Sequence, residues 1–477
     1  MIKIISHYCK KIKRMPKFLC NAALFVLQKR AECDKMIEIK GGDRAMKRVL
    51  LTKKLLDGIE KMPTIAVDAG FSAAEVCADR PFVTPVELWV KNPRVVRAMR
   101  ACGICEEKIT GLGADYEKLA VLFENLNATA GSTLAADLHA DLSMLSAPLA
   151  PTAQNAERAW QSANAYLATH DVTPRSLLAR NTDSLVRVDT GEHCEGSTFG
   201  DKIKPLVCFD TLLRIEAPDF LMQVERLGEG AGVSVKDLAT LERAIHATLD
   251  RFLVLGARAV MLDLSGFDRF EKPDAYHAAL TLASGLAGER AAFTPAAVSL
   301  WRAQFLRMLG YAMAARDMRF VLRVRPETEH VMGDFSTKAF DKLLSYLVRE
   351  KALPPTLLSL AAGDLPQGLS LLLDRFREKD GTSLLYFGIE AAGASSASLS
   401  RSLRFYLNRG AASLLLGVTD CEPGSFSAPA KARFARVLAA ELACFAATDG
   451  NGIFDEDALL HVARAVLAEQ AARFFGV

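Results

Sequence analysis

The sequence lacks three features that would place it in a specialised class of protein. Its 59 Lys and Arg residues are nearly balanced by 56 Asp and Glu residues, so it has no large positive charge for binding nucleic acid. No uncharged apolar run reaches the ~18 residues that a membrane-spanning helix needs. The ten cysteines are scattered, and Cys102 and Cys105 form a Cys-x-x-Cys pair without the second pair of a zinc site. We therefore expect a cytoplasmic protein that binds neither nucleic acid nor membrane.

The first 45 residues differ in pattern from the rest. A basic cluster, Lys10–Arg14, precedes a short apolar run, Phe18–Leu27. This pattern is compatible with a weak targeting segment, with an amphipathic helix, or with translated sequence upstream of the true start. We favour the last interpretation, because Met36 and Met46 each offer a start just before the periodic pattern begins. Residues 1–45 are accordingly expected to be poorly ordered or mis-assigned.

From Thr64 onward, short apolar runs alternate with longer helical patterns. Such alternation is typical of an α/β fold, and nearly continuous apolar runs are typical of parallel strands buried on both faces. Eight runs predict a closed, TIM-like (β/α)₈ barrel. The expected strands are Thr64–Asp68, Leu178–Thr182, Lys204–Phe209, Arg258–Asp263, Arg319–Arg325, Thr356–Ala361, Ser383–Gly388 and Ala411–Thr419.

One connection between expected strands is far too long for a single crossover. It runs from Phe71 to Leu177, and most of it has a helical pattern. We therefore expect a helical insertion at residues 71–177, after the first strand, and a barrel formed by residues 46–70 and 178–477.

Three segments of the sequence carry a resemblance to a known family. They are Leu88-Trp89 with Arg97–Arg100, Gly103 and Thr110-Gly111; Gly131–Leu134 with His139 and Leu142; and Gly417–Asp420 with Ser425-Phe426. With these segments the chain resembles the uronate isomerase family, over roughly Leu50 to Phe475. The resemblance implies a metal-binding barrel of the amidohydrolase superfamily that interconverts a uronate aldose, such as glucuronate or galacturonate, and its ketose.

Most of the family's chemical groups are replaced in this sequence. The metal-binding His-x-His segment matches Asp68-Ala69-Gly70, and the histidine of the fifth strand matches Arg323. The Arg-Pro-Asp motif matches Asp210–Leu212, and the arginine after Asp420 is Glu422. Of the catalytic groups, the resemblance therefore carries over Asp420 alone. No zinc is predicted, while a hard divalent cation held by carboxylates stays open.

Charged residues follow most of the expected strands, at the end of a barrel that carries active sites. An Asp there often only caps the following loop, which is the simpler role for Asp183 and Asp364. Clustered carboxylates disfavour joint ionisation, so we favour their pairing with Arg323 or Arg325. Alternatively, Arg323 binds the carboxylate of a sugar acid in a bidentate fork, and Asp68 and Asp263 belong to the same substrate-binding site. The residues are Asp68, Asp183, Asp210, Asp263, Arg323 with Arg325 and Glu327, Asp364, Glu390 and Asp420.

Two main functions are consistent with this pattern. One is sugar-acid isomerisation, with Asp420 as the base; the other is a catalytically inactive relative that serves as a binding or subunit-interaction module. A different reaction at a carboxylate-bound metal is a third alternative. Because the polarising groups are replaced, we expect isomerisation to be absent or several orders of magnitude slower than in a typical enzyme. A small-molecule sugar acid is the expected partner, together with self-association into a homo-oligomer.

Overall fold

The computed structural model describes most of the chain from residue 46 to residue 477. The described ranges are 46–89, 92–192, 194, 199–265, 267–289, 293–324, 336–363, 368, 372, 375–377, 380–419, 427–448 and 453–477. Several positions singled out above lie outside them: residues 1–45, Arg325, Glu327, Asp364, Asp420, Glu422, Ser425 and Phe426.

Eight parallel strands form one sheet in the order in which they occur along the chain. A parallel bridge between Val67 and Thr419 brings the last strand beside the first, so the sheet curves round into a barrel. The predicted (β/α)₈ fold is thereby confirmed. The strands are β1 (Ile65–Ala66), β2 (Asp183–Asp189), β3 (Ile203–Cys208), β4 (Ala259–Asp263), β5 (Arg319–Val324), β6 (Thr356–Ala361), β7 (Leu385–Glu390) and β8 (Leu415–Thr419).

Two of the predicted strands were misplaced. The second was predicted at Leu178–Thr182, but Pro174–Leu178 forms helix α9 and the strand begins at Asp183. The Pro after Thr173 favours a helix start, and the Thr173 side chain caps that helix by accepting a hydrogen bond from the Ser176 N–H. The eighth strand was predicted from Ala411, but Ala411–Leu414 forms a 3₁₀ turn, η7.

The interior of the barrel is apolar at one end of the strands. Successive inward positions are two residues apart because side chains alternate along a strand. Phe474 and Phe475, on the C-terminal helix α19 (Gln470–Phe475), are buried against these apolar side chains, and Arg319 at the start of β5 donates to the Phe474 carbonyl. Helix α19 therefore closes the barrel at the amino ends of its strands. The interior cluster is Ile65, Val67, Leu185, Leu206, Cys208, Ala259, Met261, Val321, Leu357, Leu416, Ala471, Phe474 and Phe475.

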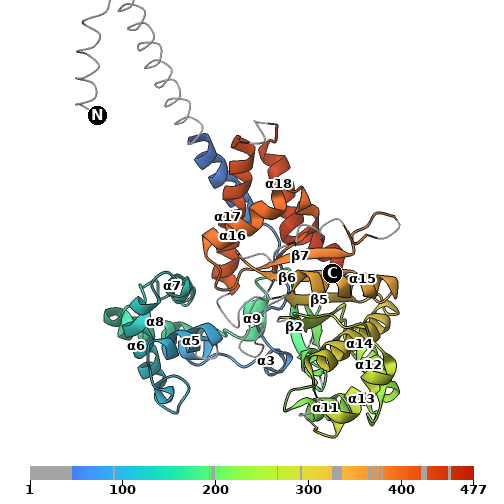
Figure 1. The fold of residues 1–477 in the computed structure, drawn as a ribbon. Coiled ribbons are helices and arrows are strands. Elements are labelled where there is room, and N and C mark those ends of the chain that lie inside the picture. Colours follow the sequence, from blue (N-terminus) through green and yellow to red (C-terminus); the bar gives the residue numbers. More distant parts are fainter. Residues whose placement is uncertain are drawn as a thin grey trace, which may run out of the picture.

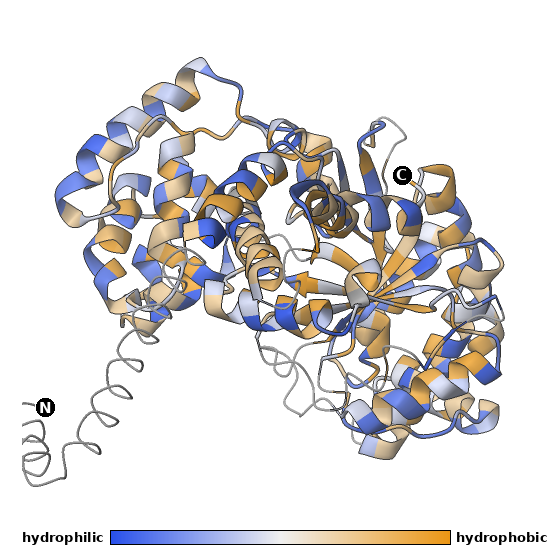
Figure 2. Cartoon of the chain, turned by 90° about the horizontal axis from the view of Figure 1, so that it is seen from above, coloured by the Kyte–Doolittle hydropathy of each residue, from blue (hydrophilic) through white to orange (hydrophobic). Residues whose placement is uncertain are grey.

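Helices surround the sheet, with apolar faces on the strands and polar faces outward (Figures 1 and 2). Local capping explains where many of them begin: Asp237 and Thr294, for example, accept hydrogen bonds from backbone N–H groups of the first helical turn. These helices are α10 (Asp210–Leu213), α11 (Phe220–Ala231), α12 (Leu238–Val254), α13 (Ala275–Leu286), α14 (Pro295–Ala314), α15 (Thr337–Arg349), α16 (Ser396–Leu407), α17 (Ser427–Thr448), α18 (Glu456–Arg464) and η9 (Ala465–Glu469); residues 46–59 are also helical.

The chain between β1 and β2 is helical, and most of its helices form a lobe beside the barrel (Figure 1). Asp137 in this lobe is buried and binds two arginines: Arg94 of the lobe, at 3.2 Å, and Arg433 of α17, at 3.1 Å. The ion pair between Asp137 and Arg433 ties the lobe to the barrel. The helices are α3 (Ala73–Ala78), α4 (Pro85–Trp89), α5 (Pro93–Ala101), η1 (Glu106–Lys108), α6 (Asp115–Asn125), η2 (Leu126–Thr129), α7 (Leu134–Met144), η3 (Ala153–Asn155), α8 (Ala156–Thr169) and α9.

The helices were compared with the length and hydropathy that a membrane-spanning helix needs. None of the helices in the described part of the chain combines the length and the apolar character needed to cross a bilayer.

Candidate functional site

A network of buried charges lies at the carboxyl ends of the strands. Arg323, at the end of β5, donates from Nε to Glu390 at 3.1 Å and from Nη2 to Asp68 at 2.9 Å. Asp68 also accepts two hydrogen bonds from Arg187 of β2, at 3.0 and 2.5 Å. Asp68, Arg323 and Glu390 are almost inaccessible, whereas the Arg187 side chain is 39% exposed. Each carboxylate is thus neutralised by a guanidinium group, and Arg187 faces the opening.

The backbone at Asp68 explains how a residue just after β1 joins this network. Its φ of 60° lies in the left-handed region, which Asp tolerates better than most residues. The turn interrupts strand alternation directly after Val67, which points into the interior cluster. A non-glycine residue in this conformation costs free energy, and such residues concentrate at functional sites.

The network continues through neutral groups to β6 and β8. The Ser359 hydroxyl donates to Glu390 at 3.1 Å and lies 2.6 Å from the Thr419 hydroxyl. Gly388 on β7 makes room for this arrangement, because a Cβ atom there would collide with Thr419. The charged and hydroxyl groups therefore link the carboxyl ends of β1, β2, β5, β6, β7 and β8.

A cavity of about 210 Å³ opens beside this network. Arginine side chains line it from four different elements, and two aspartates join them: Asp210 at the start of α10 and Asp263 at the end of β4. The carboxylate of Asp210 accepts a hydrogen bond from the Asp263 N–H at 2.6 Å. The lining residues are Arg187, Asp210, Leu213, Arg214, Asp263, Leu264, Ser265, Phe267, Arg302 and Arg323.

Asp210 is the carboxyl group whose protonation is most altered in this cavity. Burial raises its pKa to about 6, against the opposing effect of the Arg187 charge. The negative charge of Asp263 raises the Asp210 pKa further, while the hydrogen bond from Asp263 and the charge of Arg323 lower it. A carboxyl group with a pKa near neutrality can both accept and return a proton at physiological pH.

The donor set at the mouth does not fit the metal ion that the resemblance implies. Zinc binds imidazole nitrogen and thiolate sulfur readily, but the positions of the His-x-His pair hold Asp68 and Gly70. Asp68 and Glu390 could serve as oxygen ligands, yet both already accept hydrogen bonds from arginine. A guanidinium group only donates and remains charged, so Arg323 repels a cation at this place.

The structure brings together several of the residues chosen from the sequence, and it separates others. Asp68, Arg323 and Glu390 share one network, while Asp210 and Asp263 share the adjoining cavity. Asp183 was wrongly assigned to the mouth: it begins β2, so it lies at the opposite end of the barrel. Asp420, the predicted base, lies outside the described residues.

Three arginines of the site were missed from the sequence. Arg187 lies on β2, two residues after the inward-pointing Leu185, and a strand placed at Asp183–Asp189 would have revealed it by alternation. Arg214 follows α10 and Arg302 lies within α14. No spacing in the sequence marks these two, because the packing of α14 on α10, through a hydrogen bond from the Trp301 indole to the Leu212 carbonyl, brings them together.

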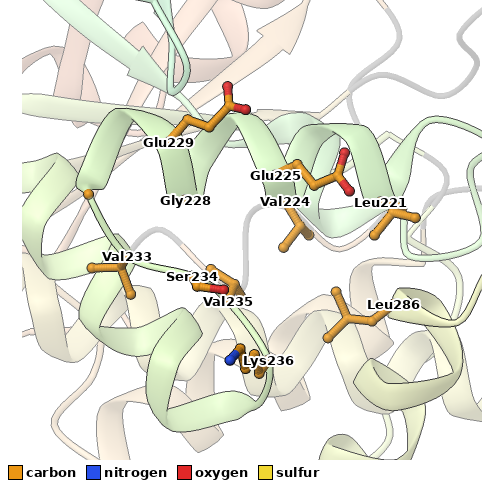
Figure 3. A pocket seen from close by; sticks show the side chains of 11 residues that line it. Leu221, Val224, Glu225, Gly228, Glu229, Val233, Ser234, Val235, Lys236 and Leu286 are labelled. Atoms are coloured by element: carbon orange, nitrogen blue, oxygen red, sulfur yellow. The ribbon is translucent and has the colours of Figure 1, made fainter.

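A larger hollow, of about 780 Å³, lies away from the mouth between α11, the segment 232–236 and α13 (Figure 3). Its walls include the apolar side chains of Val224, Val233 and Leu286. The charged side chains at its rim, Glu225, Glu229 and Lys236, are spread along it rather than directed at one point (Figure 3). The chemistry therefore points to the smaller cavity at the barrel mouth.

Comparisons with known proteins agree with the fold described above, and one family matches most of the chain. The model of a family described as glucuronate isomerase matches residues 46–475. A uronate isomerase of Halalkalibacterium halodurans is 26% identical over 365 residues, which cover 69% of this chain and 75% of that protein. A uronate isomerase of Lactococcus lactis is 26% identical over 210 residues, 42% of this chain and 44% of that protein. The chain thus matches just under half the length of the latter relative.

Solved structures match over more of the chain. The uronate isomerase of Thermotoga maritima aligns with a TM-score of 0.78 at 18% identity, covering 89% of this chain and 97% of that one. The glucuronate isomerase of Caulobacter crescentus aligns with a TM-score of 0.76 at 15% identity, covering 90% and 94%. At these identities the likeness establishes a shared fold.

Proposed function

Since the chain belongs to the glucuronate isomerase family, we propose that it binds a uronate at the barrel mouth and interconverts the aldose and the ketose slowly, without a metal ion. The observation that carries the proposal is the cavity in which a carboxyl group of pKa about 6, Asp210, lies among arginines. Its volume of about 210 Å³ is adequate for one small sugar acid. Glucuronate and galacturonate are the substrates to test first.

The proposed reaction moves one proton between neighbouring carbons of the open-chain sugar. Asp210 takes the proton from C2, the C–H electron pair forms the C1–C2 double bond, and the aldehyde oxygen becomes an enediolate oxygen. The guanidinium groups of Arg187 and Arg323, fixed by Asp68, stabilise that negative charge. Asp210 returns the proton to C1, and the C2 hydroxyl loses its proton as the ketone forms, with that proton passing to the C1 oxygen.

The rate of isomerisation is expected to be low because the two arginines have limited charge to offer the substrate. Both guanidinium groups already bind Asp68, so their charge is partly neutralised before substrate arrives. Loss of one electrophilic group commonly costs about 10²–10³ in rate, and the replacements here involve more than one group. We expect turnover several orders of magnitude below the ~10 per second of a typical enzyme. Through the family resemblance, Asp420, the residue after Thr419, stays a candidate for the proton transfer from the C2 oxygen to the C1 oxygen.

Binding without turnover is the second function to distinguish. The ion pairs of Asp68 and Glu390 favour it, because they fill the mouth with groups that already have partners. Both functions predict uronate binding, and only the first predicts chemistry at C2.

A direct assay tests the proposal. Conversion of glucuronate and galacturonate to their ketoses is followed by NMR over hours at high protein concentration. Asp210→Asn should abolish conversion, whereas Asp183→Asn, the same change at the opposite end of the barrel, should leave it unaltered. Absence of conversion of both sugars by the unmodified protein would contradict the isomerase proposal.

A further inference from the structure

Charge compensation differs among the arginines that line the cavity at the barrel mouth. Arg187 and Arg323 are paired with Asp68 and Glu390. Arg302 of α14 binds Glu216 at 2.9 Å. The Arg214 side chain forms neither a hydrogen bond nor an ion pair with any residue in the described part of the chain, although Arg214 lines the same cavity and is only partly exposed.

Arg214 is also held in a fixed place relative to the proposed base. It follows α10 (Asp210–Leu213) directly, and Asp210 is the first residue of that helix. The Trp301 indole anchors α10 through its 2.9 Å hydrogen bond to the Leu212 carbonyl, and Leu212 and Leu213 are buried. The guanidinium and the carboxylate therefore enter the cavity from one short, well-packed element.

We infer that Arg214 is the specificity-determining residue of this site: it binds the carboxylate of a singly charged sugar acid and orients the sugar's opposite, aldehyde end toward Asp210. An unpaired guanidinium group offers a fork of donors that fits a carboxylate in bidentate geometry. Since the other three arginines have ion-pair partners, Arg214 supplies the one guanidinium group among the described lining residues that forms no ion pair. A ligand with one carboxylate matches it, and a neutral sugar of the same shape does not.

This inference rests on the proposed function for its choice of ligand, but binding measurements test it separately from turnover. Calorimetric titration compares glucuronate with glucose, which differs from it in having a hydroxymethyl group instead of the carboxylate. Arg214→Gln should weaken glucuronate binding about 10- to 100-fold, as expected when a hydrogen-bonded charge pair is lost, and should leave glucose binding unchanged. Arg214→Lys should retain part of the affinity, because it keeps the charge without the fork.

Controls separate this role from a general loss of structure. Arg100→Gln removes an exposed arginine of the helical lobe, paired with Glu106, and should not alter the affinity for glucuronate. Unchanged melting temperatures would show that the variants are folded. Equal glucuronate affinity in Arg214→Gln and the unmodified protein would overturn the inference, even if isomerisation is observed. Arg214-dependent binding without any isomerisation would instead overturn the proposed function and support the inference.

Discussion

The two ends of the barrel are built from the same strands but from opposite kinds of side chain. At the amino ends, inward positions carry Leu, Val, Ile and Met, and Phe474 and Phe475 cover them. Two residues further along, Leu185 gives way to Arg187 and Val321 to Arg323. One end thus gains stability from apolar burial, whereas the other holds charges that are costly to bury unless they are paired.

This contrast is the reason why we propose the mouth, rather than the larger hollow elsewhere, as the place for chemistry. Strand alternation directs several polar side chains into one small space, and their mutual pairing keeps them there. Buried ion pairs contribute little net stability compared with apolar groups of the same size. A stability requirement alone would therefore be met equally well by an apolar mouth.

The largest expected effect comes from breaking the charge network. Arg323→Met leaves Glu390 buried without its arginine, which should lower the free energy of unfolding by about 3–5 kcal/mol. Urea denaturation measures this loss. Arg323→Met combined with Glu390→Gln should recover much of it, because the unpaired charge is then removed. If the single and double variants are equally unstable, the loss reflects packing and the network is not the cause.

A matched change at the other end should affect stability alone. Phe475→Ala removes a ring that is 1% exposed and should lower the free energy of unfolding by about 3 kcal/mol. Glucuronate affinity should stay the same, since the ring lies at the closed end of the barrel. A large change in that affinity would show that the two ends are coupled.

The third effect concerns Asp210 and depends on pH. Its pKa is about 6 in the folded protein against an ordinary value of 3.8 for an aspartate, so the folded state binds more protons than the unfolded state between these pH values. Stability contributed by this group is therefore lost as pH rises from about 4 to 6. Asp210→Asn should stabilise the protein by about 1–2 kcal/mol at pH 8, with the gain shrinking as pH falls from about 6 to about 4. A gain that is independent of pH would contradict the raised pKa.

The smallest effect is expected outside the barrel. Deleting residues 1–45, whose pattern differs from the periodic part of the chain, should change the melting temperature by no more than a few degrees. A large drop on truncation would show that this segment is part of the fold.

The sequence predicted the fold better than the site for a physical reason. Apolar strand runs and helix periodicity are local signals, so eight strands could be counted even though the second was misplaced. The site depends on contacts between distant segments, such as Asp68 with Arg187 and Arg323. Asp68, Arg323 and Glu390 could be chosen because they lie at or just after the carboxyl ends of apolar strands. Arg214 and Arg302 could not be chosen, since their approach depends on how α14 packs on α10.

The central claim is that the arginine-lined site at the barrel mouth works without a metal ion. The most direct test is to measure exchange of the C2 hydrogen of glucuronate for deuterium. The protein is dialysed against a chelator, its metal content is measured, and the sugar is followed by NMR in D₂O. We predict slow exchange that persists without bound metal, rises with pH through about 6 as Asp210 ionises, and disappears in Asp210→Asn. Exchange that stops on chelation and returns with zinc, or no exchange at any pH, would contradict the assignment.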